Sequence, residues 1–102
     1  MSLTKQYLKS RPVCKVTFRL KAKEAGDATS VKLVGDFNHW DTSVSPMRHL
    51  KNGDFTQTLT LDRDKKYAFR YLLDDNQWEN DWQADAYSAS PVSNDENSIV
   101  SV

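Results

Sequence analysis

Two tryptophans in this chain stand where an aromatic ring could bind a ligand. Trp40 ends the segment VKLVGDFNHW, a short apolar run that breaks into a polar loop, and Trp78 follows a polar turn. Flat rings stack on the apolar C–H faces of pyranose sugars, and planar side chains with several donors hydrogen-bond the hydroxyls at the ring edge. Arg70, which lies between the two tryptophans in the chain, is such a donor. This chemistry suits a neutral polysaccharide.

The same residues also have a structural interpretation. Trp40 and Trp78 could close the ends of a folded domain, and Arg70 could form an ion pair across neighbouring strands. At the level of these residues, both interpretations stay open.

Residues for catalysis or metal binding do not fall into a recognised pattern. Acid–base cleavage of a sugar needs two held carboxylates at roughly 5 to 10 Å. Asp74, Asp75, Asp81 and Asp85 instead fall in turns or a polar stretch, where we expect solvation. The two histidines lack a metal-ligand spacing, and no nucleophile elbow, phosphate-binding glycine loop or paired-cysteine motif occurs. We therefore expect that the protein is not an enzyme and that it binds neither a metal ion nor a cofactor.

Length, charge and composition limit the classes of function further. A chain of 102 residues fits one domain, and 14 basic residues balance 14 acidic ones, so no net field draws it to nucleic acid or an anionic membrane. Because Cys14 is the single cysteine of the chain, no internal disulfide can form, and we expect this residue to be a buried, inert thiol. No apolar stretch approaches the roughly 20 residues of a membrane span, and the amino terminus does not resemble a secretory signal. We expect a soluble, cytoplasmic protein.

Alternating apolar residues predict a domain built from strands. The ranges predicted to be extended are 13–21, 31–34, 47–50, 54–61, 67–73 and 98–102. Asn52-Gly53 predicts a hairpin turn. Residues 1–12 are expected to form an amino-terminal arm, as one or two helical turns or frayed, and 78–97 a long polar connection. About seven short strands with regular turn signals predict an all-β domain over 13–102, an immunoglobulin-like antiparallel β-sandwich.

Four segments together resemble carbohydrate-binding module family 48. They are GDFNHW at 35–40, YAFRYLLD at 67–74, WENDWQAD at 78–85 and ENSIV at 96–100. This family is the glycogen-binding β-sandwich of the AMP-activated protein kinase β subunit and of the front of isoamylases and glycogen branching enzymes. The resemblance covers about 13–102, with the motifs in order, and we expect a stand-alone domain of this kind.

The resemblance implies non-catalytic binding of α-1,4-linked glucan, as glycogen or starch. The two stacking tryptophans of the family fall on Trp40 and Trp78, its basic strand residue on Arg70, and its hydrogen-bonding asparagine on Asn97. The family also supplies an alternative, a docking module that packs against a glycogen-metabolising enzyme or kinase without binding sugar.

Two further residues are candidates for additional contacts. Trp82 could provide a third ring, although we expect it to pack structurally. Val92 is the nearest match to a large apolar loop residue with which the kinase subunit encircles the glucan.

Overall fold

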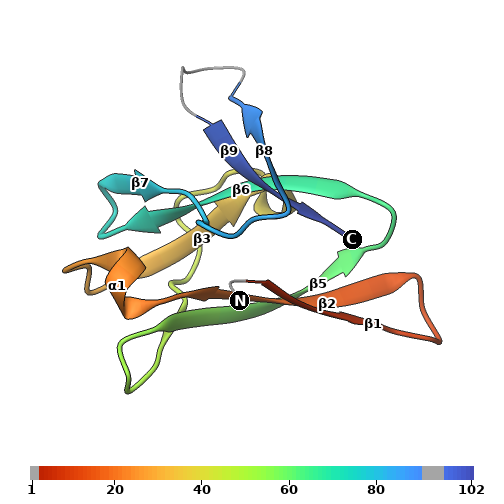
Figure 1. Cartoon of the computed structure of the whole chain (residues 1–102), viewed down its shortest axis with the longest axis horizontal. Helices are drawn as coiled ribbons and strands as arrows, with labels where there is room; N and C mark the ends of the chain where they lie inside the picture. Colours follow the sequence, from red (N-terminus) through yellow and green to blue (C-terminus); the bar gives the residue numbers. More distant parts are fainter. Residues whose placement is uncertain (1–2, 91–95) are drawn as a thin grey trace.

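Two antiparallel sheets pack face to face in the computed structural model, which describes residues 3–90 and 96–102 (Figure 1). The first sheet has the strand order β1-β2-β5-β4, and the second has the order β3-β6-β9-β8, with β7 also paired to β6. The strands of the first sheet are β1 Leu3–Tyr7, β2 Val13–Leu20, β4 Arg48–His49 and β5 Phe55–Asp62. Those of the second are β3 Val31–Gly35, β6 Lys66–Leu73, β7 Gln77–Glu79, β8 Ala86–Ala89 and β9 Glu96–Ser101. The prediction of an all-β sandwich is confirmed.

The core lies between the sheets and follows the predicted alternation. On β2, the inward side chains Cys14, Val16 and Phe18 are completely buried. From the other sheet, Phe69 meets Phe18 edge to face, with ring centroids 5.1 Å apart. Burying each large apolar side chain stabilises the fold by about 1.5–3 kcal/mol, so this alternation decides which face of each strand is inward. The prediction that Cys14 is buried is confirmed.

The amino-terminal segment differs from its prediction. The prediction of helical turns or a frayed arm was wrong for Leu3–Tyr7, which forms the strand β1. This strand pairs with β2, so that Leu3 lies opposite Phe18 and Tyr7 lies opposite Cys14. The strand lies at the sheet edge, where Leu3 is its one fully buried residue. An edge strand of this kind carries almost no alternating pattern, so its pairing partner decides its conformation.

The expected long connection after Trp78 is also partly ordered. It contains β7 and β8, which bring the number of strands in the described ranges to nine instead of about seven. All four residues of β8 are exposed, so no apolar alternation marks this strand in the sequence. Two short helical segments complete the described chain, α1 Ala22–Ala25 and the 3-10 helix η1 Asp36–Asn38. Within the described ranges, no helix has the length and apolar character needed to cross a membrane.

One edge of β6 carries two different strands in succession. β9 pairs with the first half of β6, from Lys66 to Phe69, and β7 pairs with the second half, from Tyr71 to Leu73. Arg70 stands at the point where these two strands separate. Because the chain between β7 and β9 leaves the sheet here, the backbone opens beside Arg70, and the candidate site lies at this opening.

Candidate functional site

The loop that presents Trp40 is anchored at its start by a close backbone contact and an aromatic ring. Gly35 passes so near β6 that a Cβ atom on it would lie 2.5 Å from the carbonyl oxygen of Ala68. Phe37 turns back toward the core, with its ring centroid 5.6 Å from that of Phe18 and 6.2 Å from that of Tyr67. The loop after β3 is therefore held against the sandwich before it reaches the tryptophan.

Hydrogen bonds from two polar side chains then fix the shape of the loop. Asp36 accepts two of them, from the Trp40 indole Nε1 at 2.9 Å and from the backbone amide of Ala68 at 2.8 Å. Asn38 accepts from the amide of Gly35 at 3.0 Å and donates to the carbonyl of Leu33 at 2.9 Å. Asp36 therefore ties the indole ring directly to β6.

The last two residues of this loop have a left-handed backbone. His39 and Trp40 both have φ 57°, a conformation that is unfavourable for residues with a side chain. The amide of Trp40 donates to the carbonyl of Gly35 at 2.9 Å, which closes the turn. The half-buried Trp40 ring is thus placed by the fold of the loop and not by an apolar neighbourhood alone.

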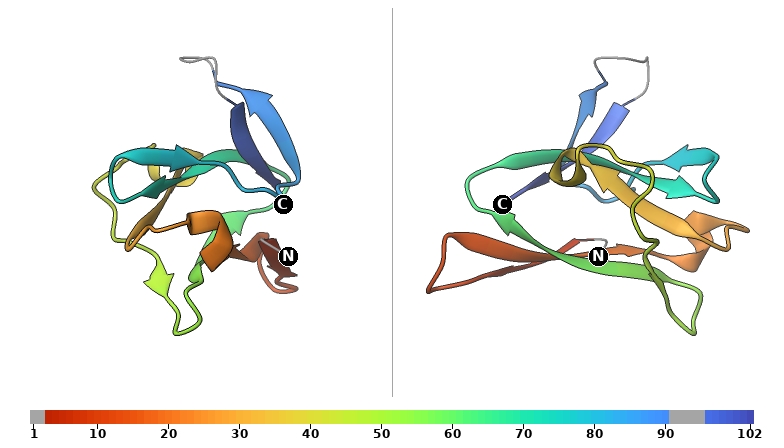
Figure 2. Two further views of the ribbon diagram at one scale, coloured as in Figure 1. Left: turned by 60° about the vertical axis from the view of Figure 1, so that its left-hand side comes forward. Right: turned by 180° about the vertical axis from the view of Figure 1, so that it is seen from behind.

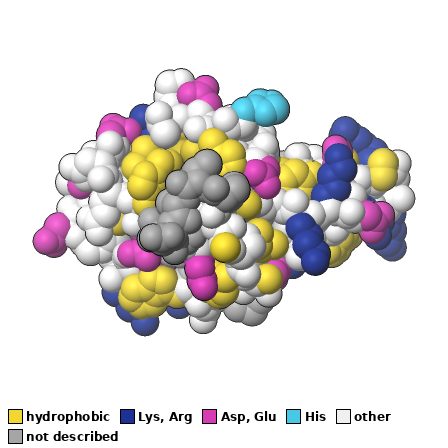
Figure 3. All heavy atoms as spheres, turned by 90° about the horizontal axis from the view of Figure 1, so that it is seen from above, with side chains coloured by type: hydrophobic (Ala, Val, Ile, Leu, Met, Phe, Trp, Pro, Cys, Tyr) yellow, Lys and Arg dark blue, Asp and Glu magenta, His cyan; other side chains and the backbone are white. Residues whose placement is uncertain are grey.

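Trp78 reaches the same place from a different element. On β7 it lies opposite Leu72 of β6, and paired residues share a face, so it points outward from the sandwich as Arg70 does. Trp78 is 43% exposed, and its ring centroid is 6.5 Å from that of Trp40, with an angle of 61° between the ring planes. Figure 3, which looks onto the outer face of the second sheet, shows hydrophobic side chains gathered there.

Lys32 connects the two segments that carry the tryptophans. Its Nζ donates to the carbonyl of Thr42, just beyond Trp40, at 3.0 Å. The same nitrogen lies 2.8 Å from a carboxylate oxygen of Asp75, in the turn before Trp78. Lys32 therefore holds the two segments in a fixed relation.

Arg70 and Asn97 form a polar pair on the outer face of the same sheet. The Arg70 Nε donates to Asn97 Oδ1 at 2.7 Å, and the two side chains are 9% and 7% exposed. Arg70 lines a pocket of about 190 Å³ together with Trp78, Glu79, Asn80 and Glu96. The guanidinium of Arg70 is therefore oriented by an amide side chain from the neighbouring strand β9.

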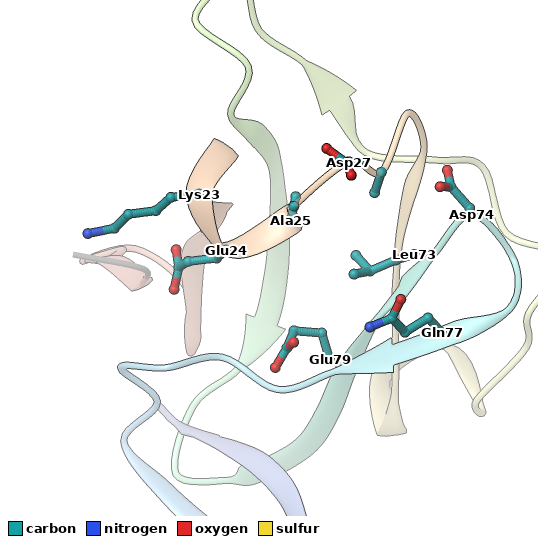
Figure 4. Close-up of a pocket in the computed structure, with 10 residues that line it drawn as sticks. Lys23, Glu24, Ala25, Asp27, Leu73, Asp74, Gln77 and Glu79 are labelled. Atoms are coloured by element: carbon teal, nitrogen blue, oxygen red, sulfur yellow. The ribbon is translucent and has the colours of Figure 1, made fainter.

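A larger cavity lies on the other side of β7 and has a different character. It encloses about 290 Å³ between α1 and the β6–β7 turn, and carboxylates of Glu24, Asp27, Asp74 and Glu79 line it (Figure 4). Its described lining has no aromatic ring on which a sugar could stack. The pocket beside Trp78 is the smaller one, but it combines a flat ring with a cation.

A family model for carbohydrate-binding module 48, described as the isoamylase N-terminal domain, matches residues 9–88. The chain belongs to carbohydrate-binding module family 48. Family 48 modules are non-catalytic binding domains, and the matched range includes Trp40, Arg70 and Trp78, whereas Asn97 lies beyond it. No curated protein matches the chain.

The sequence prediction missed the residues that position this candidate site. Asp36 and Lys32 hold the tryptophan segments, and Asn80 ties the pocket rim to β9, because its Nδ2 donates to the carbonyl of Glu96 at 2.9 Å. For Asp36 a signal was present, since a short acid follows a strand-ending glycine and precedes the indole by four residues. The contacts of Lys32 and Asn80 depend on the tertiary structure.

The aspartates expected to be solvated in this module do not all behave alike. Asp81 is buried, and its carboxylate accepts a hydrogen bond from Tyr71 Oη at 2.8 Å, so the prediction of solvation was wrong for it. Burial, with Asp81 next to the phenol, raises the pKa of Tyr71 well above its ordinary value, so the phenol stays a donor. Asp75 is mostly exposed.

Trp82 is 56% exposed, so the expectation that it packs structurally was wrong. Val92, the candidate for an apolar loop contact, lies outside the described residues.

Among the described residues, no group of three or more His, Cys, Asp or Glu side chains is arranged to hold a metal ion.

Proposed function

We propose that this module binds α-1,4-linked glucan, of the glycogen or starch type, without changing it chemically. The observation that carries the proposal is the pair of indole rings of Trp40 and Trp78, 6.5 Å apart and inclined at 61°, beside a buried cation. Each ring offers a platform for a sugar face, and Arg70 offers N–H donors to hydroxyls.

The angle between the rings favours one class of glucan. Successive sugars in an α-1,4 chain turn relative to one another, so the chain curves and presents faces in different planes. A β-1,4 chain is a nearly flat ribbon, and two platforms inclined at 61° could not both lie flat on it. The inclined pair therefore supports a curved α-glucan as the ligand.

Arg70 and Asn97 have different roles in this proposal. Arg70 lines the pocket beside Trp78 and would donate to sugar hydroxyls at the ring edge. Asn97 accepts from Arg70 Nε, so it would orient the guanidinium and act mainly through it. A buried donor that is already oriented loses little conformational entropy when the ligand binds.

The expected affinity for a short oligosaccharide is weak. Taken as net contributions, two stacking contacts of about 1 kcal/mol each and a few hydrogen bonds of about 0.5–1.5 kcal/mol sum to about 4 kcal/mol, which corresponds to dissociation constants near millimolar. Tight binding would come from the many repeats of a polymer, which raise the effective concentration of each site.

Affinity electrophoresis in gels with and without glycogen tests the proposal. The wild-type protein should be retarded by glycogen, and Trp40→Ala and Trp78→Ala should each lower the retardation by about 2- to 10-fold. Tyr7→Ala removes an exposed aromatic ring on β1 and should migrate as the wild type does. Equal migration of the wild type with and without glycogen would refute glucan binding. Co-purification with a glycogen-metabolising enzyme in that case would favour the docking alternative.

A further inference from the structure

We propose that Trp82 and Tyr87 form a second glucan platform, separate from the Trp40–Trp78 site. The inference rests on the proposed function, because it assigns the same polymer to a second surface of the module. The two rings belong to the exposed large side chains of the described chain, at 56% for Trp82 and 44% for Tyr87.

The second platform lies on the other side of the sheet from the first site. Tyr87 of β8 is paired with Ser98 of β9, and paired residues share a face. Ser98 is completely buried, whereas its neighbour Asn97 points to the opposite face, toward Arg70. The ring of Tyr87 is therefore on the inward face of the second sheet, where it is 44% exposed, and Figure 2 shows the β8–β9 hairpin projecting away from the first sheet.

Trp82 follows Asp81 directly in the chain, in a turn that is anchored to the second sheet. The Asp81 amide donates to Ser98 Oγ at 2.8 Å, and its carboxylate binds the inward-facing Tyr71. The amide of Gln83 donates to Asp81 Oδ1 at 2.8 Å, so the backbone is held on both sides of the tryptophan. An anchored turn thus presents an exposed indole.

The tyrosine ring is fixed in the same turn. Its Oη donates to the carbonyl of Asp81 at 2.5 Å and lies 3.4 Å from the amide of Ala84. The tyrosine ring and the backbone on both sides of Trp82 are therefore held before any ligand arrives, which lowers the entropic cost of stacking. Within the described part of the chain, the Trp82 indole N–H has no hydrogen-bond acceptor, and a sugar hydroxyl could supply one.

The charge and size of this surface favour a sugar over a protein. Lys5 and Asp85, which lies two residues before Tyr87, form an ion pair at 2.6 Å and offset each other's charge. Two half-exposed aromatic rings present roughly 200 Å² together, about a quarter of the roughly 800 Å² that each partner buries in a stable protein interface. One indole face, in contrast, is matched in size to one pyranose ring.

Two platforms on opposite sides of β9 would not serve one short oligosaccharide. Separate chains, or distant parts of one branched polymer, could occupy them together. The module would then bind a polymer more tightly than either platform allows, because the second contact forms at high effective concentration.

Titration of the isotope-labelled chain with maltoheptaose, followed by backbone amide shifts, tests the inference. The wild type should show two groups of shifts, one around Trp40, Arg70 and Trp78 and one over residues 81–87. Trp82→Ala should lose the second group, keep the first, and lower retardation in glycogen gels by about 2- to 10-fold. Trp82→Phe, which keeps a ring, should retain part of both effects, and Tyr7→Ala, which removes a ring that is 47% exposed, should change neither.

The outcomes separate the two proposals. Shifts only in the first group would overturn the second platform and leave the proposed function standing, whereas no shifts in either group would overturn both. Sedimentation of the wild type and Trp82→Ala over a range of concentrations adds an independent check. A dimer that Trp82→Ala disperses would assign the ring to self-association and overturn the second platform.

Discussion

At the scale of single residues, Asp36 is the side chain that decides where the Trp40 ring points. Removing its two hydrogen bonds in Asp36→Ala should lower the free energy of unfolding by about 1–2 kcal/mol and release the indole. Asp36→Asn keeps one acceptor oxygen, so it should be intermediate. Glycogen retardation and the near-ultraviolet circular dichroism of the indole should both decrease from Asp to Asn to Ala.

The control for this series is Asp62→Asn, which changes an exposed carboxylate at the end of β5. It should leave retardation and the indole signal at the wild-type level. If Asp36→Ala bound glycogen as well as the wild type, the two hydrogen bonds that Asp36 accepts would be irrelevant to binding.

Gly35 is required for steric reasons and not for its backbone conformation. A Cβ at this position would lie 2.5 Å from the Ala68 carbonyl oxygen and 2.8 Å from the Phe69 Cβ, and neither atom can move without shifting β6. Gly35→Ala should therefore lower the free energy of unfolding by about 1–3 kcal/mol, measured by urea denaturation.

Gly26 offers a contrasting case. It has φ 61° and ψ −127°, a backbone conformation that residues with a side chain rarely adopt, and a Cβ there would meet nothing within 4 Å. Gly26→Ala should therefore cost about 1–3 kcal/mol through backbone strain and not through a steric clash. Unchanged stability in Gly35→Ala would mean that the approach to β6 is loose.

At the scale of elements, a fork on β6, the point at which pairing passes from β9 to β7, creates the opening in which the candidate site lies. β9 and β7 pair with successive halves of the same strand edge, and Arg70 is left between them. Had β9 continued to pair along β6, Trp78 would have had no strand to bring it beside Trp40. The short strand β7 is therefore the element that completes the site, although it has only three residues.

The β4–β5 hairpin is tied to the rest of the sandwich by Asp54. The carboxylate accepts from the backbone amide of Ala22 and from the Arg19 guanidinium, and these contacts hold the pKa of Asp54 below its ordinary value of 3.8. A lowered folded-state pKa adds stability above the ordinary value, and that stability is lost as pH falls through the folded-state pKa. Asp54→Asn should therefore be less stable than the wild type at neutral pH, by about 1 kcal/mol.

Thermal unfolding as a function of pH measures this difference. The curves of wild type and Asp54→Asn should be separate at neutral pH and converge below pH 3.8. Asp62→Asn should lie within about 0.5 kcal/mol of the wild type throughout, because its ion pair with Lys65 is exposed. A constant gap between wild type and Asp54→Asn down to acid pH would contradict the assignment to the carboxylate charge.

At the scale of the whole molecule, glucan binding should stabilise the fold. The two tryptophans come from separate elements, so the unfolded chain has no site, and a ligand adds RT ln(1 + [L]/Kd) to the free energy of unfolding. With a Kd near 1 mM, roughly 10 mM maltoheptaose should add about 1.4 kcal/mol and raise the melting temperature by about 5–10 °C.

The comparison with Trp40→Ala and with a β-1,4 oligosaccharide makes this shift specific. Trp40→Ala should lose most of it, and cellohexaose should cause little change in the wild type. Equal shifts from both sugars would contradict the argument from the inclined rings.

The predictable part of the fold is the part with regular alternation. β2, β3, β5, β6 and β9 are recognisable because apolar side chains of each are buried in the core, and the Asn52-Gly53 hairpin is recognisable from its turn residues. β1, β7 and β8 are not, since they are short or exposed strands whose pairing alone makes them extended. The buried Asp81 was missed for the same reason, because its partners Tyr71 and Ser98 come from other strands.

The sequence alone therefore determined the all-β class and the family, and it predicted four residues for the proposed site, because alternation and short motifs are local properties of a chain. The tertiary structure decided how those residues meet. Trp40 and Trp78 become one inclined pair only because β7 adds to β6 at the fork, and Arg70 is oriented only because β9 brings Asn97 beside it. Such contacts join residues that are far apart in the chain, and their distances and angles depend on the packing of the whole sandwich.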